Sequence, residues 1–287
     1  MSTHAQIVNF PKQHSTCAHC LAVKSCPFGA VTGAGAEAAT HPTGAARVVR
    51  TGEHLFRVGD AADGVHVVRS GAVKTYITTR DGEEQVIGLH GPGELLGADA
   101  IPTGKQICNA VALDVSTVCA VTMDRILHCC ADSPAFCSSL LTSMSGRIQH
   151  DEDQLIVLGL NGADQRVACF LLEQIVACRR RGQSTREILL PMSRSDIASY
   201  LAVAVETVSR SLTRLREAGV LSVDRNLIVI QDAEALRAVA GARARGSLAA
   251  AAGPRAPRSL SIAVDAPDSS IRQTRAMTHP DRQSHAG

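Results

Sequence analysis

The sequence predicts an α+β protein that consists of a β-roll, a long helix and a winged helix-turn-helix. Short β-branched runs broken by Gly-containing turns fill residues 47–122, which favours an antiparallel roll or barrel. Apolar residues then change to helical spacing, and a second helical region ends in two β runs. With 287 residues, the chain is long enough for two domains with separate cores.

The composition limits the functions that the chain can have. Lys and Arg (29) nearly balance Asp and Glu (27), so a signal for nucleic-acid binding must be local. The N-terminus has no leader pattern, and no segment reaches the roughly 18–20 apolar residues that span a bilayer. We therefore expect a cytoplasmic protein with no membrane partner. In that compartment, metal, cluster or redox chemistry explains ten cysteines better than disulfides do.

Residues 1–46 are predicted to be a Cys-rich segment followed by a Gly/Ala linker over residues 29–46. Cys17, Cys20 and Cys26 lie in the run CAHCLAVKSC with the spacing C-x2-C-x5-C. Such a run can hold one face of an iron-sulfur cluster and leave one position for a distant thiolate, or it can bind zinc. The five cysteines of the helical stretches are expected to be small buried apolar residues, and they are Cys129, Cys130, Cys137, Cys169 and Cys178.

Residues 47–130 are predicted to form the roll and residues 131–160 the long helix. A heptad-like row follows this helix, formed by Leu141, Met144, Ile148, Asp151, Leu155 and Leu158. A helix of about 40 Å is too long to be covered by one small domain, so we expect it to pair with a second copy in a homodimer. Asp151 is the charged residue in this row. It either points to the edge near Arg147 or Gln154, or keeps the pair of helices close to dissociation.

Residues 161–238 carry the signals of a winged helix-turn-helix. Ser193 and Asp196 form a capping box that begins one helix, and a break at residues 202–204 leads to a second helix that ends before Gly219. The runs VLSV and LIVI then read as the wing. Residues 239–287 are rich in Ala, Arg, Pro and Ser, and we expect them to be a disordered tail.

The second helix carries a polar face suited to double-stranded DNA. Glu206, Ser209 and Arg210 lie three and four residues apart, and these side-chain types match base edges in the major groove. Arg214 adds charge for the phosphate backbone. The alternative is an exposed helix with an ordinary Glu–Arg pair. No phosphate loop, nucleophile elbow or catalytic carboxylate pair is present in the sequence, so an enzyme is not expected.

Residues 51–232 resemble the cyclic-AMP receptor/FNR superfamily of bacterial transcription regulators. GELLGADAI (residues 93–101) is similar to the segment that closes the cyclic-nucleotide-binding-like roll, and VETVSRSL carries the E-x-x-S-R signature of the fumarate-and-nitrate-reduction branch. The resemblance implies a dimerisation helix, recognition of a TTGAT-type inverted repeat, and an RNA polymerase contact near residues 80–85. The turn departs from the family pattern, because residues 202–204 are Ala-Val-Ala and offer neither the usual Gly nor a capping hydroxyl.

Cyclic-nucleotide-binding members of the superfamily have Arg-Ser or Arg-Thr about ten residues after Gly-Glu. Here Gly93-Glu94 is followed by residues 103–106, Thr-Gly-Lys-Gln, so no cyclic nucleotide is expected.

The resemblance also implies a [4Fe-4S] cluster held by the three N-terminal thiols and one cysteine of the roll. Cys119 occupies the expected place, with Cys108 as the competitor. The implied function is a transcription regulator that senses low oxygen and activates, or sometimes represses, anaerobic or microaerobic genes. The rival hypothesis is a regulator of the same fold that senses by thiol oxidation or zinc.

Overall fold

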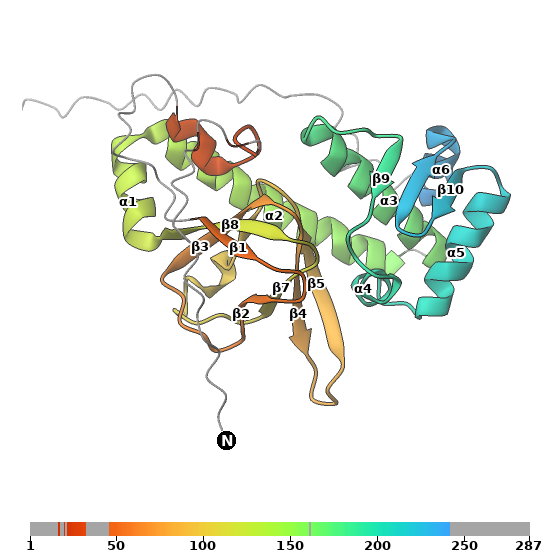
Figure 1. Cartoon of the computed structure of the whole chain (residues 1–287), viewed down its shortest axis with the longest axis horizontal. Helices are drawn as coiled ribbons and strands as arrows, with labels where there is room; N and C mark the ends of the chain where they lie inside the picture. Colours follow the sequence, from red (N-terminus) through yellow and green to blue (C-terminus); the bar gives the residue numbers. More distant parts are fainter. Residues whose placement is uncertain (1–16, 18–19, 21, 33–45, 161, 242–287) are drawn as a thin grey trace, which may run out of the picture. The chain divides into compact units, whose positions relative to one another are not determined.

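The computed structural model describes residues 17, 20, 22–32, 46–160 and 162–241 (Figure 1). Most of the predicted linker and nearly all of the predicted C-terminal tail lie outside these residues. None of the helices in the described ranges is long and apolar enough to cross a membrane.

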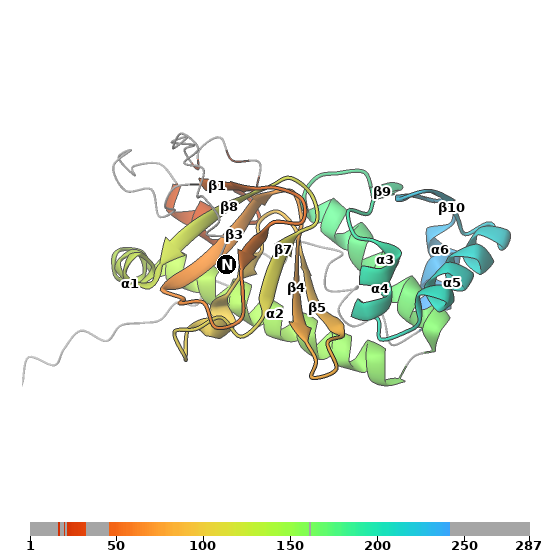
Figure 2. The same cartoon turned by 60° about the horizontal axis from the view of Figure 1, so that its bottom comes forward.

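The predicted β-roll is present as two four-stranded sheets (Figures 1 and 2). One sheet has the order β1-β8-β3-β6 and the other β2-β7-β4-β5. The strands are β1 (Ala46–Val49), β2 (His54–Phe56), β3 (Gly64–Ser70), β4 (Val73–Thr78), β5 (Glu84–His90), β6 (Leu95–Leu96), β7 (Asn109–Ala112) and β8 (Ser116–Thr122). Apolar side chains of both sheets form the roll core, which includes Val68, Val73 and Val118 together with Cys108, the residue directly before β7.

Two short 3-10 helices accompany the roll. η3 (Ala98–Ala100) follows β6, and η2 (Pro27–Thr32) comes directly after Cys26. The predicted connector from residue 29 to residue 46 is therefore wrong at its start, because residues 29–32 belong to η2.

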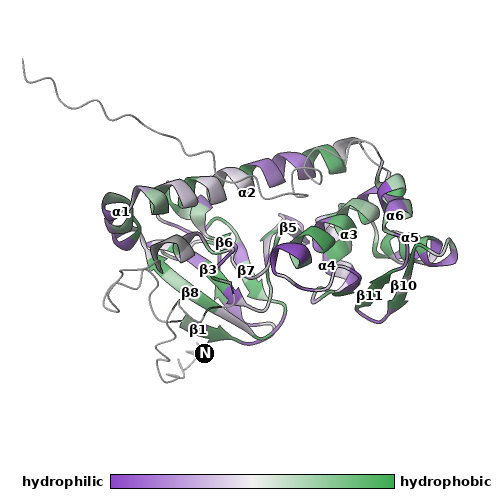
Figure 3. Ribbon diagram, turned by 90° about the horizontal axis from the view of Figure 1, so that it is seen from above, coloured by the Kyte–Doolittle hydropathy of each residue, from purple (hydrophilic) through white to green (hydrophobic). Residues whose placement is uncertain are grey.

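The long helix is present, but it begins later than predicted. α1 (Met123–Asp132) ends at Ser133, whose extended backbone separates it from α2 (Pro134–Leu160). The Ser133 hydroxyl accepts a hydrogen bond from the Phe136 amide at 3.2 Å, and Pro134 stands at the first helical position. Both features start a new helix. Figure 3 shows a hydrophilic stretch within α2, which the sequence places at residues 149–154.

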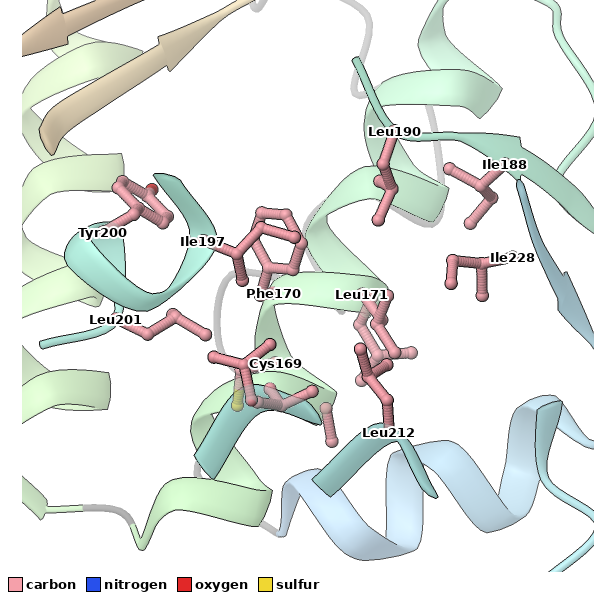
Figure 4. Close-up of a cluster of buried hydrophobic side chains, with 14 of the residues drawn as sticks. Cys169, Phe170, Leu171, Ile188, Leu190, Ile197, Tyr200, Leu201, Leu212 and Ile228 are labelled. Atoms are coloured by element: carbon pink, nitrogen blue, oxygen red, sulfur yellow. The ribbon is translucent and has the colours of Figure 1, made fainter. Parts of the chain in front are cut away.

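The C-terminal part is the predicted winged helix-turn-helix, with elements that the sequence did not indicate. Its parts are α3 (Ala163–Arg180), β9 (Glu187–Leu189), α4 (Arg194–Tyr200), α5 (Val205–Glu217), β10 (Leu221–Asp224), β11 (Leu227–Ile230) and α6 (Ala233–Ala240). β9 pairs with β11 and completes a three-stranded wing sheet. Figure 4 shows the core, where Phe170 and Leu171 of α3 meet Ile197 of α4 and Leu212 of α5.

The hairpin of β4 and β5 contacts α4 through polar groups. The Lys74 ammonium lies 2.6 Å from the Asp196 carboxylate, and both side chains are at most 14% exposed. The Ser199 hydroxyl accepts from the Val86 amide at 2.8 Å and donates to the Glu84 carbonyl at 2.9 Å. α4 thus satisfies backbone groups of β5, an edge strand that would otherwise leave them unpaired.

Candidate functional site

The thiols of Cys17, Cys20, Cys26 and Cys119 lie within electrostatic range of one another. Burial raises the pKa of the Cys26 thiol to about 12, and negative charge at the other three thiols adds to the rise. Burial likewise raises the pKa of Cys119 to about 11, with contributions from Cys17 and Cys20. Cys119 of the roll is thus close enough for its charge to affect an N-terminal thiol, although almost one hundred residues separate them in sequence.

Strand geometry separates Cys119 from Cys108. Successive side chains of a strand point to opposite faces, so Val118 enters the roll interior whereas Cys119 and Val121 share the outer face. Cys108 belongs to the interior core, where its thiol donates a hydrogen bond to the Asp99 carboxylate at 3.8 Å. Burial, followed by the charge of Asp99, raises the pKa of Cys108 to about 12. Cys119 therefore lies on the face of the roll that carries the apolar cluster against which Cys26 packs, as its strand partner Val67 does.

Local backbone hydrogen bonds fold the N-terminal segment around the thiols. The amide of Cys20 donates to the Cys17 carbonyl at 3.0 Å, and the amide of Cys26 donates to Ala22 at 2.8 Å. The segment rests on the turn at Gly93, which has φ +94°, and a Cβ added there would lie 2.5 Å from the Cβ of Ser25. Only glycine permits this close approach.

The donor chemistry of the four thiols fits a thiophilic metal centre. Four sulfur ligands suit an iron-sulfur cluster or zinc, and the Phe28 amide lowers the pKa of Cys26 by hydrogen bonding to its sulfur. Burial raises the pKa of both Cys26 and Cys119, and a bound cation would offset this effect by favouring the thiolates. Among the described residues, no group of three or more His, Cys, Asp or Glu side chains is arranged around a metal position.

Phe28 connects the Cys segment to the long helix, a contact that sequence reasoning missed. The Phe28 and Phe136 rings are fully buried, with centroids 5.2 Å apart and planes at 40°. They form one apolar cluster with residues of β3, β8 and α1, against which Cys26 is partly buried. The first turn of α2 is therefore packed directly against the residues that follow Cys26.

Much of the predicted row on α2 is exposed in the single chain. Leu141 and Ile148 are each 60% exposed and Leu155 is 71% exposed. Asp151 is also exposed, and its carboxylate lies 2.9 Å from the Arg147 guanidinium. This agrees with the prediction that Asp151 lies near Arg147, and it leaves an apolar surface available to a partner. Met144 and Leu158 are half-buried.

Polar side chains from three different helices lie close together, a cluster that no local sequence pattern could indicate. His150 of α2 lies 3.3 Å from the Glu173 carboxylate of α3 and 3.2 Å from the Tyr200 hydroxyl of α4. Burial and then the charge of Glu94 raise the pKa of Glu173 to about 8. Burial lowers the pKa of His150.

The predicted recognition face lies on α5. Glu206, Ser209 and Arg210 are all exposed, and the Ser209 hydroxyl donates to the Val205 carbonyl at 3.1 Å. Arg214 instead pairs with Asp164 of α3, with Nε 3.1 Å from Oδ2. A contact between Arg214 and a DNA phosphate would have to compete with this pair. That contact stays a prediction.

The local signals of the helix-turn-helix are present. The Ser193 amide donates to the Asp196 carboxylate at 2.9 Å, and the Asp196 amide donates to the Ser193 hydroxyl at 3.0 Å. The turn departs from regular geometry at Ala202, which has φ +50°, and Ala204 begins α5 without a side-chain cap. Gly219, with φ +74°, follows the end of α5 as predicted.

Comparison with known proteins gives the same division of the chain. Residues 46–133 match the cyclic nucleotide-binding domain family, and residues 165–239 match the Crp-like helix-turn-helix domain family. The chain is 36% identical over 193 residues to the fumarate and nitrate reduction regulatory protein of Escherichia coli K12, a match that covers 67% of this chain and 77% of that protein.

Two further relatives agree with this assignment. The transcriptional activator protein Anr of Pseudomonas aeruginosa is 38% identical over 200 residues, which cover 70% of this chain and 82% of Anr. The structure of FixK2 from Bradyrhizobium japonicum is 30% identical with a TM-score of 0.61, and the match covers 69% of this chain and 96% of that one. The chain therefore belongs to the CRP/FNR family of transcription regulators, in the fumarate-and-nitrate-reduction branch.

Proposed function

We propose that this regulator senses low oxygen through a [4Fe-4S] cluster held by Cys17, Cys20, Cys26 and Cys119. The observation that carries the proposal is the electrostatic grouping of Cys119 with the three N-terminal thiols, while Cys108 lies in the roll interior. When bound, the cluster would supply chemistry that is labile to oxygen. The same thiols could hold zinc or be oxidised directly, and that remains the alternative.

The chain's own residues then have separate tasks. The Phe28 amide favours a thiolate at Cys26, and the Phe28 ring holds the segment against Phe136 of α2. Ordering of this segment would add contacts to the start of the long helix. That is a physical route by which occupancy of the thiol site can bias dimerisation.

The dimer is proposed to bind a TTGAT-type palindrome in double-stranded DNA. The exposed row on α2 supports pairing of two chains, and each chain then presents one α5 to a half-site. On α5, Arg210 can donate two hydrogen bonds to guanine, Glu206 can accept from cytosine, and Ser209 can reach a base or phosphate. Genes of anaerobic or microaerobic growth would be activated, or sometimes repressed.

RNA polymerase is the proposed second macromolecular partner, with the loop at residues 80–85 as the contact. Residues 80–84 are exposed. Gln85 is half-buried, and its side-chain amide donates to the Ser199 carbonyl of α4 at 2.5 Å. The accessible part of this surface is therefore residues 80–84. No cyclic nucleotide is proposed, because Lys105 is exposed and Gln106 is buried where nucleotide-binding members have the Arg-Ser or Arg-Thr pair.

Anaerobic purification followed by assays of iron, acid-labile sulfide and zinc tests the proposal. The expected result is about four iron and four sulfide per chain, lost in air. Cys119→Ala should lose the cluster, whereas Cys108→Ala, the matched change of a roll cysteine, should retain it. One zinc without sulfide would support the alternative and overturn the cluster, and loss in Cys108→Ala alone would reassign the fourth ligand.

A further inference from the structure

Lys74 of the roll has its closest charged partner on the helix-turn-helix. Its ammonium lies 2.6 Å from the Asp196 carboxylate of α4, and 3.3 Å from the more exposed Glu84 carboxylate of β5. The same ammonium lies 5.3 Å from the centre of the Tyr76 ring, a distance at which a cation attracts an aromatic face. The Tyr76 hydroxyl is in turn 2.9 Å from Nε2 of His54. Lys74 is therefore held in one position between the two domains.

Two further kinds of contact join the β4–β5 hairpin to α4. The Ser199 hydroxyl bonds both the Val86 amide and the Glu84 carbonyl, and the Gln85 side chain donates to the Ser199 carbonyl. The Val86 side chain is 3% exposed and belongs, with Tyr76, to the apolar core of the helix-turn-helix. An ion pair, backbone hydrogen bonds and apolar packing thus all require the same placement of α4 on the hairpin. These contacts are called the hairpin–α4 contact below.

The position of α4 determines the position of the recognition helix. Ile197 and Leu201 of α4 pack in one core with Val208 and Leu212 of α5 (Figure 4). Packed helices of this kind move together, because their side chains interdigitate. The predicted base-reading face of α5 is exposed while the hairpin contacts α4. The hairpin–α4 contact therefore fixes the orientation of α5 without covering the face that would meet DNA.

We propose that the hairpin–α4 contact positions α5 for DNA binding and that Lys74 is a positioning residue in the roll. A dimer must place two recognition helices on half-sites about one turn of DNA apart. A reading domain that is already held in one orientation loses less freedom when it binds. The inference rests on the proposed palindrome and deepens it, since it assigns part of the affinity for two half-sites to a residue outside the helix-turn-helix.

Amide hydrogen exchange of the full-length protein, purified without oxygen, tests the contact itself. The Val86 amide donates to the Ser199 hydroxyl, so its exchange reports whether the hairpin is held on α4. Lys74→Met removes the charge but keeps an unbranched chain, and it should speed exchange at Val86 while the β4–β7 ladder keeps its protection. Glu84→Gln is the matched control, because it removes the other carboxylate near Lys74, and it should leave Val86 protected.

Fluorescence anisotropy then tests the consequence for DNA binding. Lys74→Met should weaken binding to the palindrome about tenfold and leave binding to DNA with a single half-site unchanged, because only two sites together require a fixed orientation. Ser199→Ala opens the same contact from the side of α4 and should have the same effect. Two base pairs inserted between the half-sites should weaken the parent more than either variant. Glu84→Gln should bind like the parent.

The outcomes separate positioning from a general loss of structure. Equal weakening on the palindrome and the single half-site would mean that the variants damage the helix-turn-helix, and it would overturn the proposal. Tighter binding to the palindrome would also overturn it, because the contact would then oppose DNA binding. The exchange measurement needs no DNA. Unchanged exchange at Val86 in Lys74→Met overturns the role of Lys74, whereas a parent that fails to bind the palindrome counts against the proposed function.

Discussion

Ala202 carries a conformational cost in the turn between the two helices of the DNA-reading element. Its φ of +50° lies in the left-handed region, which costs an alanine about 1–2 kcal/mol. Glycine avoids this cost but loses about 0.4–1 kcal/mol through greater freedom in the unfolded chain. Ala202→Gly should therefore raise the free energy of unfolding by about 0.5–1 kcal/mol in urea titrations. Ala202→Val should lower it, and equal stability of all three proteins would contradict the argument.

Arg210 is the residue on which base recognition is expected to depend most. Arg210→Ala should weaken binding to the TTGAT-type palindrome by about 1–3 kcal/mol per half-site and reduce discrimination at one base pair. Fluorescence anisotropy with the palindrome and with single-base variants measures both effects. Arg216→Ala, an exposed change on the same helix, should weaken binding to all these DNAs about equally. A uniform loss in Arg210→Ala would mean that Arg210 contacts phosphate.

At the scale of the element, the sequence predicted what local chemistry determines. The Ser193–Asp196 capping box and Gly219 marked helix ends, and the structure has both helices there. β9 was missed because three residues become a strand only by pairing with β11. The long helix was predicted to begin at residue 131, three residues before Pro134, because the apolar spacing near Ser133 does not reveal the extended backbone that separates α1 from α2.

Some residues of the candidate site could likewise be predicted from the local sequence, and others only from the folded structure. The C-x2-C-x5-C spacing was visible in the sequence, but Cys119 and Cys108 both lie in β-like stretches there. Resemblance favoured Cys119, and the physical distinction, outer face against roll interior, needs the folded roll. Cys130 and Cys137 were expected to be buried, but both are half-buried, because their exposure depends on how α1 and α2 meet in the fold.

Phe28 tests whether the Cys segment and α2 act as one element. Phe28→Ala removes a fully buried ring from the contact with Phe136, a truncation that typically costs about 3–5 kcal/mol. We expect faster amide hydrogen exchange in residues 22–32 and in the first turn of α2, while the roll strands keep their protection. Phe56→Ala is the matched control inside the roll and should have the opposite pattern. Unchanged exchange at the start of α2 would exclude this route of coupling.

At the scale of the whole molecule, Glu173 is expected to make stability depend on pH. Its pKa is about 8 in the folded protein, whereas an unfolded chain has a glutamate pKa of about 4.3. The folded state thus holds a proton that the unfolded state has lost, so stability falls as pH rises through that window and levels off above it. The side chain is 31% exposed, so solvent screening reduces the effect below what the full pKa difference implies.

Glu173→Gln isolates this contribution from that of His150, whose lowered pKa acts in the acidic range. The difference in free energy of unfolding, parent minus variant, should decrease from about pH 5 to about pH 8 in urea titrations. Glu152→Gln, an exposed change on α2, should show no such trend. A difference that is flat with pH would mean that Glu173 is already ionised in the folded protein.

Asp151 decides how readily two whole molecules associate. Burying Leu141, Ile148 and Leu155 against a partner favours the dimer, whereas bringing two Asp151 carboxylates into the same interface opposes it. The pair with Arg147 is exposed and offsets little of that cost. If each interface loses about 3 kcal/mol to the two carboxylates, Asp151→Ala should tighten the dimer about a hundredfold in sedimentation equilibrium of cluster-free protein in air.

Two comparisons separate this role of Asp151 from a simple effect of its ion pair. Glu152→Ala removes the adjacent carboxylate outside the row and should leave the dimer affinity unchanged, because Glu152 is not at a row position. Arg147→Ala leaves the Asp151 carboxylate without its counter-charge and should weaken the dimer further. If Asp151→Ala and Arg147→Ala shift the affinity in the same direction, the ion pair itself controls association. Opposite shifts would identify the Asp151 carboxylate itself as the group that opposes association of the two chains.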